Sequence, residues 1–582
     1  MATPATPATA RTAGPLDGLC LERSGPPGPA DSVIAEHLRL LGAETDGSSG
    51  GRLALTGGEV GGFNVRTTWG ETASDEATVQ AATGIMAVHG RRDGAPRGLA
   101  VDYATTATGV LAVQGLLAGL LARARGGRVA QVEVSAERAG LLAVSQYLAA
   151  AGAEEDEAAE LGPGGPPFTS ADGIVFELET LDPGVWASFW RTLDAPEESI
   201  RRGWRPFQFR YATACAPIPQ TLHEATRASS WERIRYAADV SGADVCPLRS
   251  LAERAAEYDG APPWSLAPHD AAYTPGRATD GPPLAGFTVL EAGRRIQAPL
   301  AAHLLCLLGA EVIRIEPPGG DPLRGMPPAC SGISARWLAL NRGKKAVEVD
   351  IKSAAARERL REMAADADVF LHNWAPGKAA QLGLDHDHLA AANPALVYAY
   401  TSGWADRLPG APMGTDFMVQ ARTGVGEAVR PAGDPSAPSL MTLLDVLGGL
   451  LGVEAVLAGL LLRERTGRGV RVDSSLLGAA DVLTAPHRVR AAQGLDPRRP
   501  AGFRRPLRTS DGWIALEDHC TAPYDVGELS TGQALERLND RGLAAVPVVT
   551  DLAALLASGV SSGPIARDAY GAPAVPDPWS FA

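Results

Sequence analysis

The sequence predicts an α/β protein made of two related copies of one pair of domains. Similar segments recur at a nearly constant offset, and strands and helices are expected to alternate in the second half. VQAATG begins at Val79 and VQARTG at Val419, an offset of 340 residues that still holds at Gly127 and Gly467. A period this long exceeds any solenoid repeat, so whole domains are duplicated.

The two copies are unequal, because each lacks a segment that the other retains. LGAE recurs at Leu41 and Leu308, an offset of only 267 residues, so the first copy has lost about 73 residues before VQAATG. Farther along, VCPLRSLAE around Pro247 matches VPVVTDLAA around Pro547 at an offset of 300 residues, so the second copy lacks about 39 residues there. The expected parts are an N-terminal arm (1–29), a truncated large domain (30–160), a first small domain (161–275), an intact large domain (284–485) and a shortened second small domain with the C-terminal tail (486–582).

The chain has 582 residues, a net charge of −14 and a pI near 5.3. This length predicts several domains, and the negative charge argues against a nucleic-acid partner, although scattered Arg and Lys can still bind a small anion. The Ala/Thr/Pro-rich start, MATPATPATARTAGP, has no apolar core of the kind that secretion signals carry. It is therefore expected to be a disordered arm of a cytoplasmic protein.

Two further features are interpreted as structural. The apolar run from Leu440 to Leu462 is long enough to span a membrane. Asp445, Glu454 and four glycines within it favour a buried core helix, and no membrane association is expected. The six cysteines show no Cys-x-x-Cys spacing, which argues against zinc sites and a disulfide framework, and no metal site is expected.

The second copy opens with a strand, a helix and another strand within about thirty residues. These are expected at Phe287–Gly293, Ala298–Ala310 and Glu311–Pro318, and such a unit is a right-handed crossover between parallel strands. Further strands are expected at Lys344–Ile351, Asp368–Trp374 and Ala395–Trp404, with a helix at Ser353–Ala367. Ligands of open parallel sheets bind beyond the carboxyl ends of the strands, so the loops GGDPLRG, LNRGKK, NWAPGK and TSGW are expected to carry the binding site.

The residues of these loops suit a flexible ligand that carries phosphate. Arg324 lies in the first loop, and the second loop contains Arg342, Lys344 and Lys345. Arg can bind phosphate with two hydrogen bonds and Lys acts as a point charge, while Trp374 offers a plane on which a base can stack. Neither a Gly-x-Gly-x-x-Gly turn nor a Walker loop is present, so dinucleotides and triphosphates are not favoured. Solvated loop residues remain the alternative for each position taken singly.

From Leu284 to about Leu483 the chain resembles the family III CoA-transferases, which include formyl-CoA transferase, carnitine CoA-transferase and α-methylacyl-CoA racemase. The matching pieces are VLEAGRRIQAP, LLGAEVIRIEPPGGDPLRG, LNRGKKAVEVDIK, DVFLHNWAPGKAAQLGL, SGW, and LLD followed by a helix that closes in TGRG. The spacing from Asp445 to Thr466 agrees with that from the nucleophilic Asp of the family. The first copy resembles the family more faintly, through LLGAE, VQAATG, AGLLARARGGR and the PPFTSADG to VCPLRSLAE tail.

The resemblance implies a transferase that moves CoA between an acyl-CoA and a carboxylic acid. Asp445 would attack the thioester, and an aspartyl anhydride and an aspartyl-CoA thioester would follow. The first copy has Thr105 at the matching position, so one active site per chain is implied. No tightly bound cofactor is implied, and CoA enters as a substrate. The implied CoA-binding residues are Arg294, Arg324, Asn341, Arg342, Lys344, Lys345, Asn373, Trp374, Pro376, Gly377, Lys378 and Gly403.

Several alternatives remain open. On local sequence alone, Asp445 is equally a helix N-cap. Racemases of the family carry a Gly-His-Asp step, and Gly414-Thr415-Asp416 stands here, so a two-base epimerase is disfavoured because threonine cannot act as a general base. An acyl-CoA epimerase, a related lyase or dehydratase, and a CoA-binding or scaffolding pseudoenzyme are the competing functions. Gln381 stands where family members often have an Arg that contacts CoA.

The family also implies how the copies are arranged. Its homodimers are interlocked, and each active site lies between the large domain of one subunit and the small domain of the other. Each copy here is thus expected to have a Rossmann-like parallel-sheet large domain and a smaller α+β domain, joined as an interlocked pseudo-dimer that is a monomer or a homodimer in solution. The first small domain is expected to cover Asp445. Asp182 is a candidate lining residue, with a loop acid before a helix as the alternative.

Overall fold

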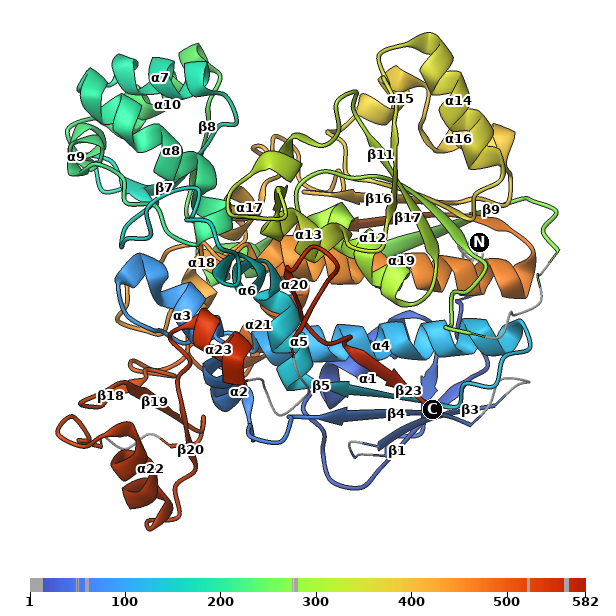
Figure 1. Cartoon of the computed structure of the whole chain (residues 1–582), viewed down its shortest axis with the longest axis horizontal. Helices are drawn as coiled ribbons and strands as arrows, with labels where there is room; N and C mark the ends of the chain where they lie inside the picture. Colours follow the sequence, from blue (N-terminus) through green and yellow to red (C-terminus); the bar gives the residue numbers. More distant parts are fainter. Residues whose placement is uncertain are drawn as a thin grey trace, which may run out of the picture.

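The computed structural model describes residues 14–48, 50, 52–57, 62–274, 276, 281–520, 524–558 and 565–582. Two long helices, α4 (Tyr103–Ala124) and α19 (Leu443–Thr466), lie between two β-sheets at the centre of the molecule (Figure 1). Two smaller α/β units project from one end of this layered body, one beside each sheet.

The sheet of the second half has the parallel arrangement that the sequence predicts. Its strand order is β14 (Lys345–Glu348), β11 (Glu311–Glu316), β10 (Thr288–Ala292), β15 (Val369–His372), β16 (Val397–Ser402), β17 (Gly469–Ser475) and β9 (Trp264–His269). All neighbours are parallel except β9, which is antiparallel to β17. Helices on both faces complete the unit: α12 (Gln297–Leu307) and α19 on one, and α14 (Ala354–Ala365), α15 (Lys378–Leu382) and α16 (His386–Ala392) on the other (Figure 1).

The sheet of the first half is mixed, so the parallel sheet predicted for this copy is wrong. Its order is β2 (Glu44–Thr45), β1 (Cys20–Ser24), β3 (Arg52–Thr56), β4 (Phe63–Thr68), β5 (Gln131–Ser135) and β23 (Trp579–Phe581). β1 and β2 are parallel across helix α1 (Asp31–Leu40), and β4 and β5 are parallel, but β3 is antiparallel to both of its neighbours. The shortened segment leaves β3 and β4 a connection that is too short for a parallel crossover.

The predicted disordered arm, residues 1–29, is wrong for the part from Gly14 onward, while residues 1–13 lie outside the described residues. Leu16 and Leu21 are fully buried, and β1 pairs with both β2 and β3. Low complexity ends near Gly14, and the apolar side chains after it have a sheet to pack against.

The duplicated segment folds in the same order in both halves. In the first half, α2 (Glu76–Ala82) and α3 (Ile85–Gly90) precede α4, which is followed by β5, α5 (Ala136–Ala143) and α6 (Ser145–Ala151). In the second half, α17 (Asp416–Arg422) and α18 (Val425–Ala428) precede α19, which is followed by β17, α20 (Leu476–Leu483) and α21 (Ala485–Ala492). The equal succession of helices and strands extends the similarity seen in the sequence.

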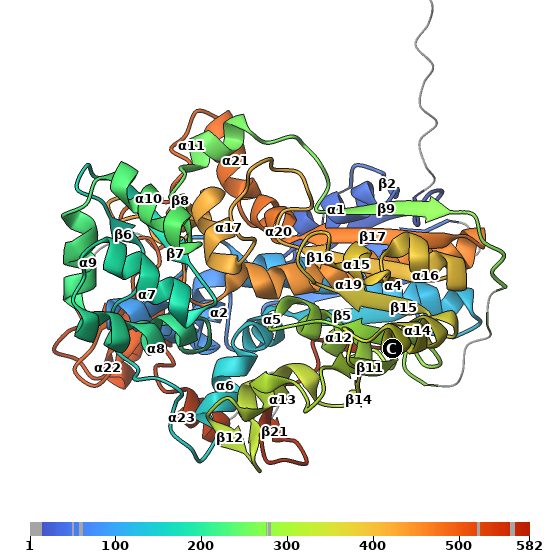
Figure 2. The same cartoon turned by 90° about the horizontal axis from the view of Figure 1, so that it is seen from above.

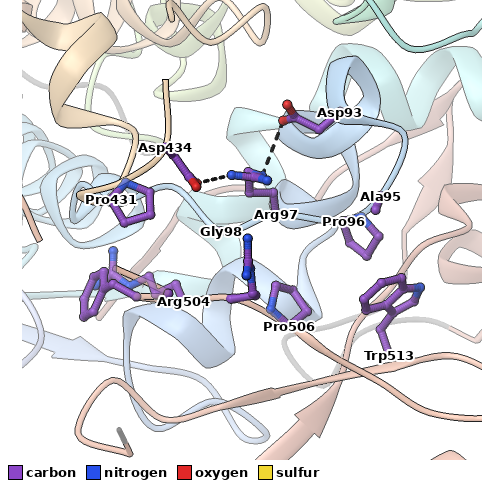
Figure 3. Close-up of a pocket in the computed structure, with 13 residues that line it drawn as sticks. Asp93, Ala95, Pro96, Arg97, Gly98, Pro431, Asp434, Arg504, Pro506 and Trp513 are labelled. Atoms are coloured by element: carbon purple, nitrogen blue, oxygen red, sulfur yellow. Dashed lines mark hydrogen bonds and ion pairs between the residues drawn. The ribbon is translucent and has the colours of Figure 1, made fainter. Parts of the chain in front are cut away.

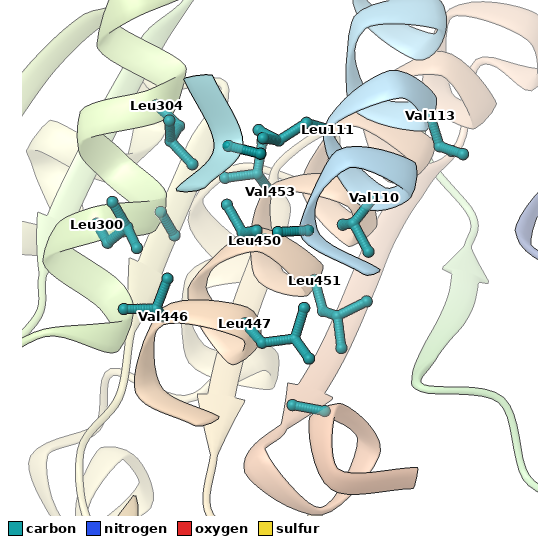
Figure 4. Close-up of a cluster of buried hydrophobic side chains, with 14 of the residues drawn as sticks. Val110, Leu111, Val113, Leu300, Leu304, Val446, Leu447, Leu450, Leu451 and Val453 are labelled. Atoms are coloured by element: carbon teal, nitrogen blue, oxygen red, sulfur yellow. The ribbon is translucent and has the colours of Figure 1, made fainter. Parts of the chain in front are cut away.

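Helices α4 and α19 pack against each other at the centre of the protein. Their contact is made by apolar side chains such as Val110, Leu111, Leu450 and Leu451 (Figure 4). Each helix is long and apolar enough to cross a membrane, but 94% of its most apolar window is buried inside the protein. The prediction of a buried core helix around Asp445 is therefore confirmed.

The small units differ in size as the sequence predicts. The first has strands β6 (Phe168–Thr169), β7 (Val175–Glu179) and β8 (Asp244–Pro247) with helices α7 (Pro183–Thr192), α8 (Glu197–Thr213), α9 (Gln220–Arg227) and α10 (Trp231–Ser241). The second has β18 (Leu507–Arg508), β19 (Trp513–Leu516) and β20 (Ala545–Pro547) with α22 (Thr531–Asn539). The remaining short elements are η1 (Arg91–Asp93), α11 (Leu251–Ala256), η2 (Pro322–Gly325), β12 (Ala329–Cys330), β13 (Ile333–Ser334), α13 (Ala335–Asn341), α23 (Leu552–Ser558), β21 (Ala566–Arg567) and β22 (Pro573–Ala574).

The chain passes from each small unit to the sheet of the other half. After the first small unit, β9 adds to the second sheet beside β17, although it falls in the range expected for the first small domain (Figure 2). After the second small unit, β23 adds to the first sheet beside β5. The two halves are thus joined by a reciprocal exchange of edge strands.

Candidate active site

Asp445 lies in the first turn of α19 and faces a cavity of about 740 Å³. The loops that follow β10, β15 and β16 line this cavity, at the carboxyl edge of the parallel sheet where the sequence predicts the site. The first small unit supplies the opposite wall, with Glu179, Leu181, Tyr211 and Asp244. The cavity is thus built from both halves of the chain, as expected for the first small domain.

A buried carboxylate holds the start of α19. The backbone N–H of Asp445 donates to Asp416 Oδ2 (2.7 Å), and Gln420 Nε2 donates to Asp416 Oδ1 (2.5 Å). The first copy repeats the arrangement, because Thr105 N donates to Glu76 Oε2 (2.7 Å) and Gln80 Nε2 donates to Glu76 Oε1 (2.8 Å). Negative charge at the N-terminus of a helix is favourable, so both copies fix this helix start in the same way.

The pKa of the Asp445 carboxyl is raised well above its usual value. Burial is the largest cause, the negative charges of Asp416 and Glu179 add to it, and the Arg295 guanidinium opposes it. Burial also raises the pKa of Asp416 to about 6. The two carboxyls therefore titrate as a coupled pair, and the ionised form of Asp445 is more basic than a free aspartate.

The small unit contributes Glu179, which sequence reasoning missed. Its Oε2 accepts the hydroxyl hydrogen bond of Thr415 (2.8 Å), and its Oε1 accepts from Arg210 Nη2 (3.0 Å). Asp182, a candidate for this place, instead caps α7 by accepting from the N–H groups of Gly184 and Val185 and is exposed to solvent. The alternative interpretation of Asp182, a loop acid before a helix, is therefore confirmed, and Glu179 at the end of a buried strand lines the cavity. An acid within the apolar strand VFELE was the available signal.

Asp416, Gln297 and Arg295 also line the cavity. From the sequence, Asp416 was named only as the end of the Gly414-Thr415-Asp416 step, and Gln297 and Arg295 were not singled out. A signal existed for Asp416, since it and Glu76 are acids at the same 340-residue offset as VQARTG and VQAATG. Gln297 and Arg295 follow β10 in GRRIQAP, where nothing in the sequence distinguishes them from neighbouring loop residues.

Half of the residues implied for CoA binding line this cavity or an adjoining one. The adjoining cavity, of about 660 Å³, lies beyond β10 and β11. Asn373 fixes the loop after β10, because its side chain accepts from Arg294 N (2.9 Å) and donates to Arg294 O (3.0 Å). The lining residues are Arg294 and Trp374 in both cavities, Asn373, Pro376 and Gly403 in the first, and Lys378 in the second.

The other implied residues are engaged inside the protein or on its surface and do not line these two cavities. Lys344 is buried and donates to Glu291 Oε2 (2.8 Å), and burial lowers its pKa to about 8. Arg324 pairs with Glu316 (2.8 Å) and stacks over Trp337. The rest are Asn341, which donates to Trp337 O, Arg342, which donates to Pro573 O, Lys345, which pairs with Glu311, and Gly377, which directly precedes α15 with a φ of 73°.

The matching region of the first copy is closed by an arginine from the second small unit. Arg504, with 1% of its side chain exposed, pairs with Asp102 (2.6 Å) and Asp518 (2.5 Å). It also donates to the carbonyl oxygens of Leu99 and Val101, which lie just before α4. A cavity of only about 300 Å³ remains beside it, where Arg97 pairs with Asp93 and Asp434 (Figure 3). In this region of the first copy, Thr105 stands at the position that matches Asp445, so the carboxylate is missing there.

Comparison with known proteins agrees with the resemblance read from the sequence. A sequence model of CoA-transferase family III matches residues 55–260 and 284–544. Mouse succinyl-CoA:glutarate CoA-transferase is 36% identical over 201 residues, which cover 34% of this chain and 46% of the mouse protein. A probable fatty acyl-CoA transferase of Mycobacterium tuberculosis is 35% identical over 256 residues, which cover 40% of this chain and 65% of that protein. Acetyl-CoA:oxalate CoA-transferase of Acetobacter aceti is 34% identical over 197 residues, which cover 33% of this chain and 51% of that protein.

The chain spans about half to two thirds of the length of these relatives. Among solved structures, a CAIB/BAIF family protein from Brucella suis is 29% identical with a TM-score of 0.37, and the match covers 48% of this chain and 72% of that one. The family match extends over both halves and over most of the sequence. The chain therefore belongs to CoA-transferase family III.

Proposed function

We propose that this protein is a CoA-transferase that moves CoA from an acyl-CoA to a carboxylic acid through covalent adducts of Asp445. The observation that carries this proposal is the position of Asp445, which faces a cavity at the carboxyl edge of the parallel sheet. The names of the relatives, which include transferases of succinyl-CoA and acetyl-CoA, support the same reaction class. No tightly bound cofactor is needed, because all the chemistry is acyl transfer.

The reaction proceeds in balanced steps. A carboxylate oxygen of Asp445 attacks the thioester carbonyl, the C–S bond breaks, and CoA leaves as a thiolate from a mixed anhydride. The thiolate attacks the side-chain carbonyl of Asp445, so the donor acid leaves and an aspartyl-CoA thioester forms. The acceptor carboxylate repeats the sequence in reverse and releases the new acyl-CoA. Covalent catalysis divides one difficult exchange into easier steps.

Gln297 is the side-chain donor best placed to stabilise the oxyanions of these steps. It begins α12 and lines the Asp445 cavity, and among the residues that the structure describes its Nε2 makes only a long contact with Ser402 O (3.4 Å). Gly448 and Gly449 let α12 approach this closely, because a Cβ at either position would lie 2.9 Å from an atom of Gln297. A donor fixed in a water-poor site stabilises a developing negative charge more than it would in water.

CoA would enter across the two joined cavities. The cavity beyond β10 and β11 is lined by five cationic residues, among which Arg294, Lys352 and Lys378 suit the phosphates of the nucleotide end. Trp374 lines both cavities and offers a face to the adenine. The pantetheine arm would then run past Arg294 toward Asp445.

The chain would work as a pseudo-dimer with one active site. The exchange of β9 and β23 and the lining of the Asp445 cavity by the first small unit support this arrangement. Arg504 occupies the matching region of the first half, so a single CoA per chain is expected. The assembly is expected to be a monomer, and two CoA per chain would contradict it.

One experiment separates the candidate functions. The full-length protein is incubated with a panel of acyl-CoAs, and hydroxylamine or intact mass is used to detect an adduct at Asp445. An adduct that Asp445→Asn abolishes supports transfer. Loss of α-deuterium without an adduct supports an epimerase or lyase, although Thr415 donates to Glu179 and provides no second base. Neither signal across the panel supports a CoA-binding pseudoenzyme.

A further inference from the structure

Arg295 occupies an unusual position at the end of β10. Its backbone has a φ of +62°, a left-handed conformation that glycine adopts freely and that costs another residue about 1 kcal/mol. The preceding residue, Arg294, is held at both its N–H and its C=O by the side chain of Asn373. The loop therefore holds a long cationic side chain at a place where the backbone favours no side chain at all.

Arg295 is exposed to solvent, and among the described residues its guanidinium makes no ion pair. By contrast, the buried arginines near the site have acidic partners: Arg210 pairs with Glu179 and Arg314 with Glu291. The guanidinium carbon of Arg295 lies 5.4 Å from the centroid of the Tyr211 ring. It faces the negative charge of Asp445 closely enough to lower the pKa of that carboxyl.

Arg295 also marks a junction of three cavities. Besides the Asp445 cavity and the cavity beyond β10 and β11, a third cavity of about 430 Å³ opens between α8 and the loop after β11. Among the described residues, Arg295 alone lines all three. The third cavity shares five lining residues with the Asp445 cavity: Glu179, Leu181, Tyr211, Arg295 and Phe417.

The third cavity is lined by both apolar and polar side chains. Phe209 and Tyr211 of α8, Phe417 of α17, and Leu323 and Met326 from the loop after β11 form its apolar part, and Arg205, Gln208 and Arg210 of α8 also line it. The acids near Asp445 would repel a second carboxylate that entered without a cation. Arg295 is the cation that lines both the third cavity and the Asp445 cavity, and Arg210 is already paired with Glu179.

We propose that Arg295 binds the carboxylate of the acceptor acid, and that the third cavity receives an aromatic or apolar body of that acid. This inference rests on the proposed transferase function. The guanidinium holds the carboxylate with two hydrogen bonds while one carboxylate oxygen attacks the carbonyl carbon of the aspartyl-CoA thioester. The C–S bond of that thioester breaks and the electron pair leaves on the CoA sulfur. The acceptor is a monocarboxylic acid with an apolar body, such as an arylacetate, rather than a short dicarboxylic acid.

The test separates the acceptor half-reaction from the donor half-reaction. Arg295→Gly is chosen because glycine accepts the backbone conformation, so the variant removes the guanidinium without straining the loop. Formation of the Asp445–CoA adduct from an acyl-CoA, measured by intact mass without acceptor, is expected to change less in KM than the acceptor reaction, and its pH profile is expected to shift upward because Arg295 no longer lowers the pKa of Asp445. With phenylacetate as acceptor, the KM is expected to rise about 10- to 100-fold, which matches the loss of a hydrogen-bonded charge. Arg295→Lys is expected to recover part of this loss, because lysine keeps the positive charge but cannot make the two parallel hydrogen bonds of a guanidinium.

Arg201→Gln is the matched control, since Arg201 is an exposed arginine on α8 that pairs with Glu198 and lines none of the three cavities. It is expected to leave both half-reactions unchanged. The inference is overturned if Arg295→Gly keeps the wild-type KM for the acceptor, if it raises the KM for acyl-CoA instead, or if succinate and glutarate are better acceptors than phenylacetate. Absence of any adduct in the wild-type protein would refute the proposed transferase function itself, which is a different result.

Discussion

Three glycines near the start of α19 allow a sharp test of how this helix meets α12. A Cβ at Gly449 would lie 2.9 Å from the backbone oxygen of Gln297 and 3.3 Å from Leu300 Cβ. A Cβ at Gly448 would lie 2.9 Å from Gln297 Nε2. At Gly452 the nearest atom, Ser474 Oγ, is 3.5 Å away, which is an ordinary contact.

The expected stability changes follow from these distances. Alanine in place of glycine inside a helix gains about 0.5 to 1 kcal/mol, and Gly452→Ala should show this gain because nothing must move. Gly449→Ala overlaps a backbone atom that cannot rotate away, so an overpacking cost of about 1 to 3 kcal/mol should leave a net loss of about 1 to 2 kcal/mol. Gly448→Ala meets the end of the Gln297 side chain and should change the free energy of unfolding little.

Thermal unfolding followed by circular dichroism, and the rate of Asp445–CoA adduct formation, measure the two effects. The melting temperature should be highest for Gly452→Ala and lowest for Gly449→Ala. Gly448→Ala should slow adduct formation at least about tenfold, since it displaces the Gln297 amide, while Gly452→Ala should leave the rate unchanged. If Gly449→Ala is as stable as Gly452→Ala, the contact between α12 and α19 does not require glycine at position 449. If Gly448→Ala forms the adduct at the full rate, Gln297 does not stabilise the reaction.

Three further outcomes are expected. Asp445→Asn should abolish the adduct and should raise the melting temperature more at pH 8 than at pH 5. The pKa of Asp445 is raised in the folded state, so the contribution of this carboxyl to stability is complete at low pH and is lost as the pH rises. An equal change in melting temperature at both pH values would contradict this. Thr105→Asp should not create a second site, because Arg504 fills that region, and isothermal titration should still give one CoA per chain. Glu179→Ala should cost about 3 to 5 kcal/mol in unfolding experiments, because the buried Arg210 loses its ion pair, whereas Asp182→Ala should cost about 1 kcal/mol as a helix cap.

Much of the second half could be predicted because its signals are local. The strands and helices from Phe287 to Trp404 follow runs of apolar residues bounded by glycine, and all of the expected strands form. Loops at the carboxyl ends of parallel strands meet at one edge of the sheet, so the expectation that NWAPGK and TSGW contribute to the cavity needed no tertiary information.

The first half was harder to predict because it lacks a segment of about 73 residues that the second half retains. The lost segment removed crossover helices, and a hairpin of β3 and β4 took their place, which reversed the direction of β3. The exchange of β9 and β23 was equally invisible, since an edge strand has the same local pattern whichever sheet it joins. Among the implied CoA-binding residues, Arg294 lines the cavities whereas Lys344 is buried and paired with Glu291, and the sequence alone does not distinguish these two cases.

By itself, the sequence determined the duplication, the family, the parallel sheet and the identity of Asp445 as the carboxylate that only one copy retains. Only the tertiary structure decided which side chains surround Asp445: Asp416, which accepts from its backbone N–H, Glu179 and Tyr211 from the first half, and Arg295 from the loop after β10. The physical reason is that strands and helices depend on neighbours within a few residues, whereas burial, charge pairing and cavity walls depend on residues that lie hundreds of positions apart in the chain.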